Sequence, residues 1–153
     1  MNEPLGVNAP QVTNTSAVVG EPLPGVEGFD YQNNPHVIRH PAVVIVVAHW
    51  CDYCQREVAA LNSAVREDLP QGNLYLISTW QMWPRAWPPA EALRVAGFPG
   101  EVIVDTTSVL SRNLGIDGVP YAIATDRNGI VREVLSGEAS LEDLRMLAER
   151  AQQ

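Results

Sequence analysis

The sequence predicts an α/β domain with a central mixed β-sheet flanked by helices. Two apolar runs, 43–47 and 74–78, have the length and composition of strands buried on both faces of a sheet. The apolar residues between these runs recur at helical spacing, at Cys54, Val58, Leu61 and Val65. A helix that joins two such strands makes them parallel. We expect this helix to start at Cys51 and to stop at the turn residues 70–72.

The second half of the chain adds a further helix and strand before a terminal hairpin and helix. A loop rich in Trp and Pro, 79–89, follows the second strand. The elements expected after it are short helices at 90–96 and 108–114 and strands at 101–105, 121–125 and 130–135. The turn sequence at 126–129 predicts that the last two strands pair antiparallel. Ser140 is predicted to cap the closing helix, with Asp143 as its capping-box partner.

The composition indicates one domain preceded by a tether. The chain has 153 residues, of which 46% are hydrophobic, enough for a single core. Residues 1–28 are rich in Pro, Gly, Asn and Thr and have few large apolar side chains, so they are predicted to form a flexible tether. Residues 29–153 are predicted to form the domain.

The net charge argues against nucleic acid as a partner, and the lengths of the apolar runs argue against a membrane-spanning helix. The formal net charge is -8, and all ten basic residues are arginines that form no basic stripe, so nucleic acid is not an expected partner. The longest apolar run, 42–48, is far shorter than the roughly 20 residues that span a bilayer. The first residues also lack the basic and long apolar stretches of a signal peptide.

The only two cysteines, Cys51 and Cys54, lie at the predicted start of a helix that follows a buried strand. The free N–H groups and the dipole at a helix N-terminus stabilise a thiolate. We therefore predict that Cys51 is the attacking thiol and that Cys54, one turn further in, is the resolving thiol. The pattern predicts redox chemistry without a cofactor.

Two structural interpretations of the cysteine pair remain open. A disulfide that closes so small a loop constrains the unfolded chain little, so stabilisation alone is a weak reason for it. A zinc site needs about four ligands, and only His36, His40 and His49 are available to complete one. No metal is therefore expected.

Three features together resemble the thioredoxin superfamily across residues 29–153. They are the segment Trp50-Cys51-Asp52-Tyr53-Cys54, the Val119-Pro120 pair ahead of a strand and hairpin, and the closing helix. Cys51 and Pro120 are 69 positions apart, which leaves room for an inserted helix and strand that simple thioredoxins lack. This insertion and the entry segment 20–24 are similar to the TlpA/ResA-like branch of extracytoplasmic thiol-disulfide oxidoreductases. The implied fold is thioredoxin-like, with the helix-strand insertion between the first βαβ unit and the strand after Pro120.

The resemblance also implies roles for individual residues. It implies that the Val119-Pro120 bond is cis, that the Val119 backbone pairs with a substrate strand beside Cys51, and that Trp50 contacts substrate. Glu57 stands where this branch commonly carries a glutamate that influences the thiols; an ordinary solvated glutamate is the alternative. Thioredoxins carry a buried aspartate where this chain has Ile45, so a proton relay through that aspartate is not available.

Two further features near the cysteines have two interpretations each. Trp83 and Trp87 in the 79–89 loop are predicted to lie on the rim that receives a protein substrate, since large rigid aromatic side chains suit a recognition surface. The alternative is that they close the core over the inserted helix. His49 is interpreted as a polar residue at a strand end, and the alternative is a group that tunes the thiolate or contacts substrate.

These observations predict an enzyme that exchanges disulfides with exported proteins through Cys51 and Cys54. Asp52 places a negative charge near the thiolate, which favours a reductant. The resemblance implies protein thiol substrates, with apocytochrome c as one candidate, and a membrane-bound upstream redox partner. It also implies an extracytoplasmic location, secreted, periplasmic or membrane-tethered, through a signal or anchor that this chain does not include. The expected state is a monomer.

Two other functions remain as alternatives. A peroxidase of the peroxiredoxin type needs Thr or Ser three residues before its reactive cysteine, and this chain has Ala48 there. The second alternative is a redox-inert binding or chaperone module with the same fold.

Overall fold

The computed structural model describes residues 17–153, and the expectation for residues 1–16 lies outside this range. Seven strands form one mixed sheet in the order β2-β1-β5-β4-β3-β6-β7. The strands are β1 (Glu27–Phe29), β2 (Pro35–Val37), β3 (Ala42–Ala48), β4 (Asn73–Thr79), β5 (Glu101–Val104), β6 (Tyr121–Thr125) and β7 (Val131–Ser136). The helices are α1 (Asp52–Ser63), α2 (Pro89–Ala92), α3 (Val109–Asn113) and α4 (Leu141–Ala151), with single 3₁₀ turns at Arg66–Asp68 and Val95–Gly97.

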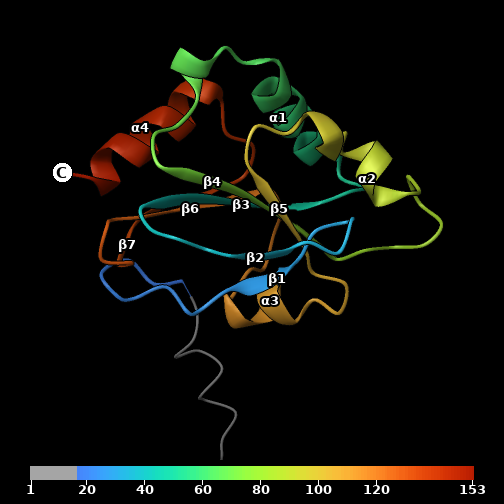
Figure 1. Cartoon of the computed structure of the whole chain (residues 1–153), viewed down its shortest axis with the longest axis horizontal. Coiled ribbons are helices and arrows are strands. Elements are labelled where there is room, and N and C mark those ends of the chain that lie inside the picture. The colour runs from blue at the N-terminus through green and yellow to red at the C-terminus, as the bar shows by residue number, and fades with distance from the viewer. Residues whose placement is uncertain (1–16) are drawn as a thin grey trace, which may run out of the picture.

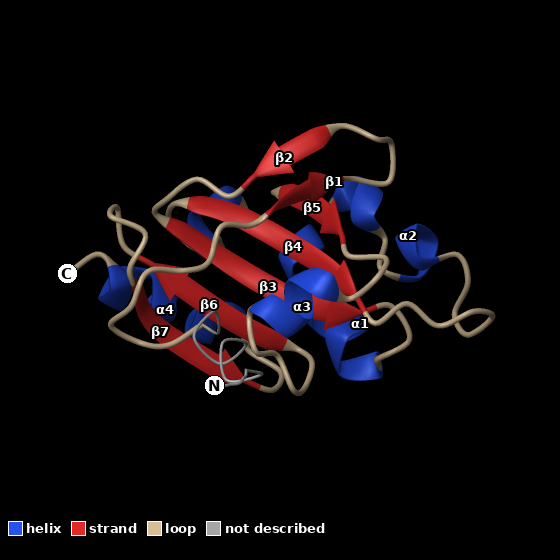
Figure 2. Cartoon of the chain, turned by 90° about the horizontal axis from the view of Figure 1, so that it is seen from below, coloured by secondary structure: helices blue, strands red, loops and turns tan. Residues whose placement is uncertain are grey.

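β3 is an interior strand of the sheet, between β4 and β6, and is buried along its whole length. It pairs parallel with β4, as the sequence predicts, and antiparallel with β6. Val43, Ile45 and Val47 pack into the core beneath α1 and α4. Val44 and Val46 point to the opposite face, where α3 covers the sheet. Figures 1 and 2 show these two layers of helices, with α1, α2 and α4 on one face and α3 on the other.

The inserted helix and strand are present as α2 and β5. β5 pairs parallel with β4, so the insertion extends the parallel part of the sheet. β6 and β7 form the predicted antiparallel hairpin. Ser140 caps α4, and its hydroxyl and the Asp143 carboxylate complete the predicted capping box.

α1 ends seven residues before the predicted stop at 70–72, at Ser63. Leu61 is the last residue of the apolar stripe that reaches the core, and Val65 is 59% exposed. Ser63 and Val65 both have low helix propensity, so without a buried contact the helix does not continue. A single 3₁₀ turn and an extended connection lead to β4 instead.

The described part of the segment expected as a tether, 17–28, packs against the domain. Leu23 and Val26 are 8% and 4% exposed, and backbone hydrogen bonds join Gly20 and Glu21 to Val131. Although the segment has few apolar residues, its backbone groups pair beside β7 and two of its side chains enter the core. It leads into β1, which forms with β2 a short hairpin that the sequence analysis did not predict.

No helix within residues 17–153 is long and apolar enough to cross a membrane.

Candidate active site

Cys51 and Cys54 lie at the start of α1, just after the end of β3. Cys51 is the N-cap residue of the helix, with an extended backbone (φ -90°, ψ 119°). Its Sγ accepts a hydrogen bond from the Cys54 N–H at 3.3 Å, and its carbonyl accepts one from the Gln55 N–H. The Cys51 sulfur therefore occupies the place of the side-chain oxygen in an ordinary N-cap, where the helix dipole and a free amide favour negative charge.

The two thiols differ in exposure. Cys51 is 8% exposed and Cys54 is 0% exposed. Burial raises the pKa of Cys54, and its hydrogen bond with Cys51 and the Glu57 charge act in the same direction. Of the two thiols, only that of Cys51 is accessible from the surface.

Glu57 is a buried carboxylate one turn beyond Cys54, only 2% exposed. Its Oε1 accepts a hydrogen bond from the Ala139 N–H at 2.8 Å, while its Oε2 is buried without a partner among the described residues. Burial raises the pKa of Glu57 to about 7, and the carboxylates of Glu138 and Asp143 add to this effect. The ordinary solvated glutamate that the sequence left open is not what the structure shows.

Val119 and Pro120 lie beside the end of β3 that carries the cysteines. β6 runs antiparallel to β3 with Tyr121 opposite Val46, so the residues just before β6 flank the strand end that leads to Cys51. The Val119–Pro120 peptide bond is cis, and Pro120 is buried. No other described residue forms a backbone hydrogen bond with Val119.

The 79–89 loop reaches the same edge of the sheet. Ala48 at the end of β3 pairs with Thr79 at the end of β4, so the segments that follow both strands leave the sheet together. Trp83 is 71% exposed and Trp87 is 45% exposed, and their rings meet edge to face at 5.2 Å. Both side chains are far more exposed than core residues, so neither tryptophan is buried in the core.

The residues before Cys51 hold this loop, a role that the sequence analysis did not identify. The Trp50 indole N–H donates to the Trp80 carbonyl at 2.8 Å, and the Arg85 guanidinium lies 5.1 Å from the Trp50 ring. His49 is fully buried and bonds to the loop through both ring nitrogens. An unbroken apolar strand followed directly by His is the one sequence signal for this contact, since a buried histidine must find polar partners.

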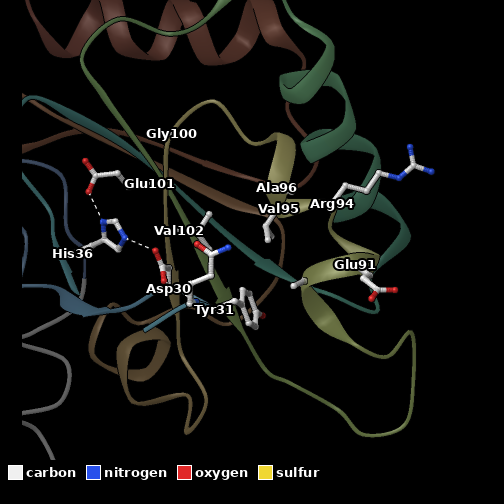
Figure 3. A pocket seen from close by; sticks show the side chains of 12 residues that line it. Asp30, Tyr31, His36, Glu91, Arg94, Val95, Ala96, Gly100, Glu101 and Val102 are labelled. Atoms are coloured by element: carbon white, nitrogen blue, oxygen red, sulfur yellow. Dashed lines mark hydrogen bonds and ion pairs between the residues drawn. The ribbon is translucent and has the colours of Figure 1, made fainter. Parts of the chain in front are cut away.

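A separate cleft of about 660 Å³ lies on the β1–β2 side of α2. Asp30, Tyr31 and Glu101 line one wall, and Glu91 and Arg94 line the other (Figure 3). Its lining does not include the two cysteines. The charged groups of the first wall bond one another through His36, which lies 2.9 Å from Asp30 and 2.8 Å from Glu101.

Residues 17–153 contain no group of three or more His, Cys, Asp or Glu side chains arranged to hold a metal ion. The histidines considered as zinc ligands bond elsewhere. His36 bonds to Asp30 and Glu101, His40 to Thr125, and His49 to the 79–89 loop.

The structure has a thioredoxin-like fold, and the solved structures that resemble it are thiol-disulfide oxidoreductases of the thioredoxin superfamily. The thioredoxin domain of a thiol-disulfide oxidoreductase from Bacteroides vulgatus aligns with a TM-score of 0.64, covering 88% of this chain and 97% of that one at 20% identity. A thio-disulfide isomerase from Thermus thermophilus aligns with a TM-score of 0.57, over 83% and 92% of the chains, at 24% identity. A secreted disulfide oxidoreductase from Mycobacterium tuberculosis aligns with a TM-score of 0.65, over 81% and 94%, at 12% identity.

At these identities the likeness establishes the fold. No protein-family model matches the chain, and no curated protein matches it in sequence.

Proposed function

We propose that this chain is a thiol-disulfide oxidoreductase that exchanges disulfides with protein substrates through Cys51 and Cys54. One observation carries the proposal. The sulfur of Cys51 takes the N-cap position of α1, where it accepts the Cys54 N–H, while Cys54 is fully buried one turn behind. This arrangement gives one thiol that can attack from the surface and a second that can reach only the first.

The reaction proceeds in two exchanges. The Cys51 thiolate attacks one sulfur of a substrate disulfide, forms a mixed disulfide and releases the other substrate sulfur as a thiolate. Cys54 then loses its proton and attacks the Cys51 sulfur, which releases the second substrate thiolate. The substrate gains two electrons, and the chain is left with a Cys51–Cys54 disulfide that an upstream dithiol must reduce.

The charges of Glu57 and Asp52 favour electron transfer from this chain to its substrate. A site that strongly stabilises its thiolates is an oxidant, since its reduced form is then favoured. Here burial and the Glu57 charge raise the pKa of Cys54, and Asp52 in the first turn of α1 opposes the helix dipole. We therefore propose a reductant.

The substrate strand is proposed to lie along Val119. Its backbone groups have no protein partner among the described residues, and the register of β6 on β3 puts it next to the segment that holds Cys51. An extended peptide could pair there as an added strand. Trp50, Trp83 and Trp87 are proposed to contact the same substrate from the other side of Cys51.

We propose an extracytoplasmic setting, in which exported proteins, apocytochrome c among them, are the substrates and a membrane-bound dithiol protein is the electron donor. The secreted oxidoreductase of Mycobacterium tuberculosis, which shares this fold, supports this setting. The working state is proposed to be a monomer.

The test combines turnover with trapping. The chain should catalyse insulin reduction by dithiothreitol, and Cys51→Ala and Cys54→Ala should each abolish it. Cys54→Ala should also accumulate a mixed disulfide on Cys51, seen as a mass increase that dithiothreitol reverses. A substrate trapped on Cys54 in the Cys51→Ala variant would reverse the roles, and an inactive unmodified chain would refute the function.

A further inference from the structure

His49, directly after β3, joins the end of that strand to the 79–89 loop. Its side chain is 0% exposed. Its Nε2 accepts a hydrogen bond from the Met82 N–H at 3.0 Å, and its Nδ1 lies 3.1 Å from the Ala86 carbonyl oxygen. One buried ring therefore ties two points of the loop, four residues apart, to the segment that carries Cys51.

These two partners fix the protonation of the ring. A carbonyl can only accept, so Nδ1 carries the hydrogen, and a backbone N–H can only donate, so Nε2 must be unprotonated. Burial lowers the pKa of His49, and the nearby Arg85 charge acts in the same direction, which agrees with a neutral ring. With both nitrogens engaged, neither is free to exchange protons with the thiols.

Trp80, Gln81 and Arg85 also contact the rest of the fold, but the tip of the loop is exposed. Met82, Trp83 and Trp87 are all more than 40% exposed. Ala86 has φ +45°, a left-handed conformation that costs a residue with a Cβ roughly 1–2 kcal/mol. Such a conformation persists only where its surroundings impose it, and the bond from His49 to the Ala86 carbonyl is one such constraint.

The same contacts orient the exposed tryptophans. The edge of the His49 ring meets the Trp87 ring at 5.8 Å, and Trp87 in turn meets Trp83. Removing the His49 bonds would leave the Met82 N–H and the Ala86 carbonyl to turn toward water, since both residues lie on an exposed part of the loop. The aromatic pair would then lose its fixed place at the edge of the sheet where Cys51 lies.

We propose that His49 is a positioning residue that holds Trp83 and Trp87 as a preformed surface for a polypeptide substrate with apolar side chains next to its disulfide. This inference rests on the proposed function. A preformed surface avoids the cost of ordering the loop on binding, so the gain applies to substrates large enough to touch it. A small aromatic disulfide reaches Cys51 without using the loop.

Three substitutions of His49 test its hydrogen bonds to Ala86 and Met82 separately. Asn carries its amide where Nδ1 lies, and Gln carries its amide where Nε2 lies. His49→Asn therefore retains a donor to Ala86, His49→Gln retains an acceptor for Met82, and His49→Phe retains the ring but neither bond. His40→Phe is the matched control, because His40 bonds to Thr125 at the opposite end of β3.

The activity readout is the ratio of kcat/KM for insulin to kcat/KM for the small disulfide 5,5′-dithiobis(2-nitrobenzoate). We expect His49→Phe to lower this ratio about tenfold through KM for insulin, with the small-disulfide rate nearly unchanged. His49→Gln should recover part of the ratio, and His40→Phe should leave it as in the unmodified chain. Equal slowing of both substrates, or an unchanged ratio, would overturn the proposal.

A second readout is independent of activity. The chain has three methionines, so ¹⁵N-methionine labelling gives few amide signals, with Met146 in the middle of α4 as an internal reference. The Met82 amide should exchange with solvent much faster in His49→Phe and stay protected in His49→Gln. An unchanged Met82 amide in His49→Phe would also overturn the proposal. If the unmodified chain reduces neither substrate, the proposed function fails, and Met82 protection then tests the loop contact alone.

Discussion

Glu57 is the buried acid of this site, and it comes from α1 rather than from β3. Ile45, where thioredoxins carry an aspartate, is fully buried in the apolar core beneath α1 and leaves no polar group on that strand. Glu57 is positioned instead by its bond to the Ala139 N–H, in the segment that leads into α4. Its free, buried Oε2 makes the charge of this residue depend on pH near neutrality.

Removing the charge of Glu57 should move the titration of Cys54 to lower pH. The Glu57 carboxylate contributes to the raised pKa of Cys54, and glutamine has no charge. The measurement is thiolate ultraviolet absorbance against pH in a Cys51→Ala background, where Cys54 is the only thiol. Glu142→Gln, an exposed position on α4, is the control and should titrate like its parent. Coincident titration curves for Glu57→Gln and its parent would show that the Glu57 charge does not affect the pKa of Cys54.

The same substitution should change how stability depends on pH. The pKa of Glu57 is about 7 in the folded chain against an ordinary value of 4.5, so its charged form is disfavoured by folding. Stability is therefore lost as pH rises from about 4.5 to 7, by on the order of 3 kcal/mol. Glu57→Gln lacks this loss, so its free energy of unfolding relative to the parent should rise across this range in urea titrations. A constant difference would contradict the burial of a titrating carboxylate.

At the scale of elements, the 79–89 loop is expected to contribute to substrate recognition more than to stability. Trp83 and Trp87 are 71% and 45% exposed, so replacing both with alanine should cost about 1 kcal/mol of stability or less. Insulin reduction should slow, while reaction with a small disulfide should not. A large fall in Tm in calorimetry, or equal slowing of both reactions, would assign the pair to the core.

The cap of α4 offers a comparison between two serines at helix starts. The Ser140 hydroxyl accepts from the Asp143 N–H, whereas Ser108 at the start of α3 makes no such bond. Ser140→Ala should therefore lower the free energy of unfolding by about 1 kcal/mol, and Ser108→Ala by less. Urea denaturation of the two variants measures both values. A larger loss at Ser108 would mean that the capping box contributes little.

Elements with buried, periodic side chains were predictable from the sequence, and those held by backbone pairing were not. β3, β4 and α1 are marked by apolar runs or stripes, and the α4 cap by its own residues. β1 and β2 have three residues each, and only one of each three is even partly buried, so they carry no pattern that a sequence analysis can detect.

The site was predictable where chemistry is local and unpredictable where it depends on distant contacts. Cys51 and Cys54 are marked by their spacing after an apolar run. The partners of His49 lie 33 and 37 residues away, and the partner of Glu57 lies 82 residues away. No local pattern records such pairings, so the burial of both side chains emerges only from the folded chain.

At the scale of the whole molecule, one ion-paired histidine links the β1–β2 hairpin to the rest of the sheet. β1 touches β5 through a single strand pair, Phe29 with Val104. His36 in β2 adds a second link, because its ring lies between Asp30, in the hairpin turn, and Glu101 at the start of β5 (Figure 3). The Tyr31–Ser78 and Tyr75–Val37 hydrogen bonds also attach the hairpin, and the charge of His36 contributes one further part of its attachment.

This attachment should weaken as pH rises above neutrality. The bond to Asp30 raises the pKa of His36 above its ordinary 6.5, with Glu101 acting in the same direction, so protonated His36 stabilises the fold fully below pH 6.5. That contribution is lost as pH rises through the folded-state pKa of His36. The same bond lowers the pKa of Asp30 below 3.8, so the Asp30 contribution is lost only as pH falls below that value. The combined contribution is complete between about pH 3.8 and 6.5.

His36→Gln should therefore be less stable than the parent chain mainly in this window, and the difference should shrink above it. Urea midpoints over a pH series measure the difference. His40→Gln is the matched control, and its stability difference should depend on pH in the opposite direction. Burial lowers the pKa of His40, so neutral His40 contributes stability above pH 6.5 that is lost as pH falls. A His36→Gln difference that stays constant, or that grows with pH, would show that the ring does not bridge the two carboxylates as a cation. Amide exchange at Val37 in β2, faster in His36→Gln within the same window, would locate the loss in the hairpin.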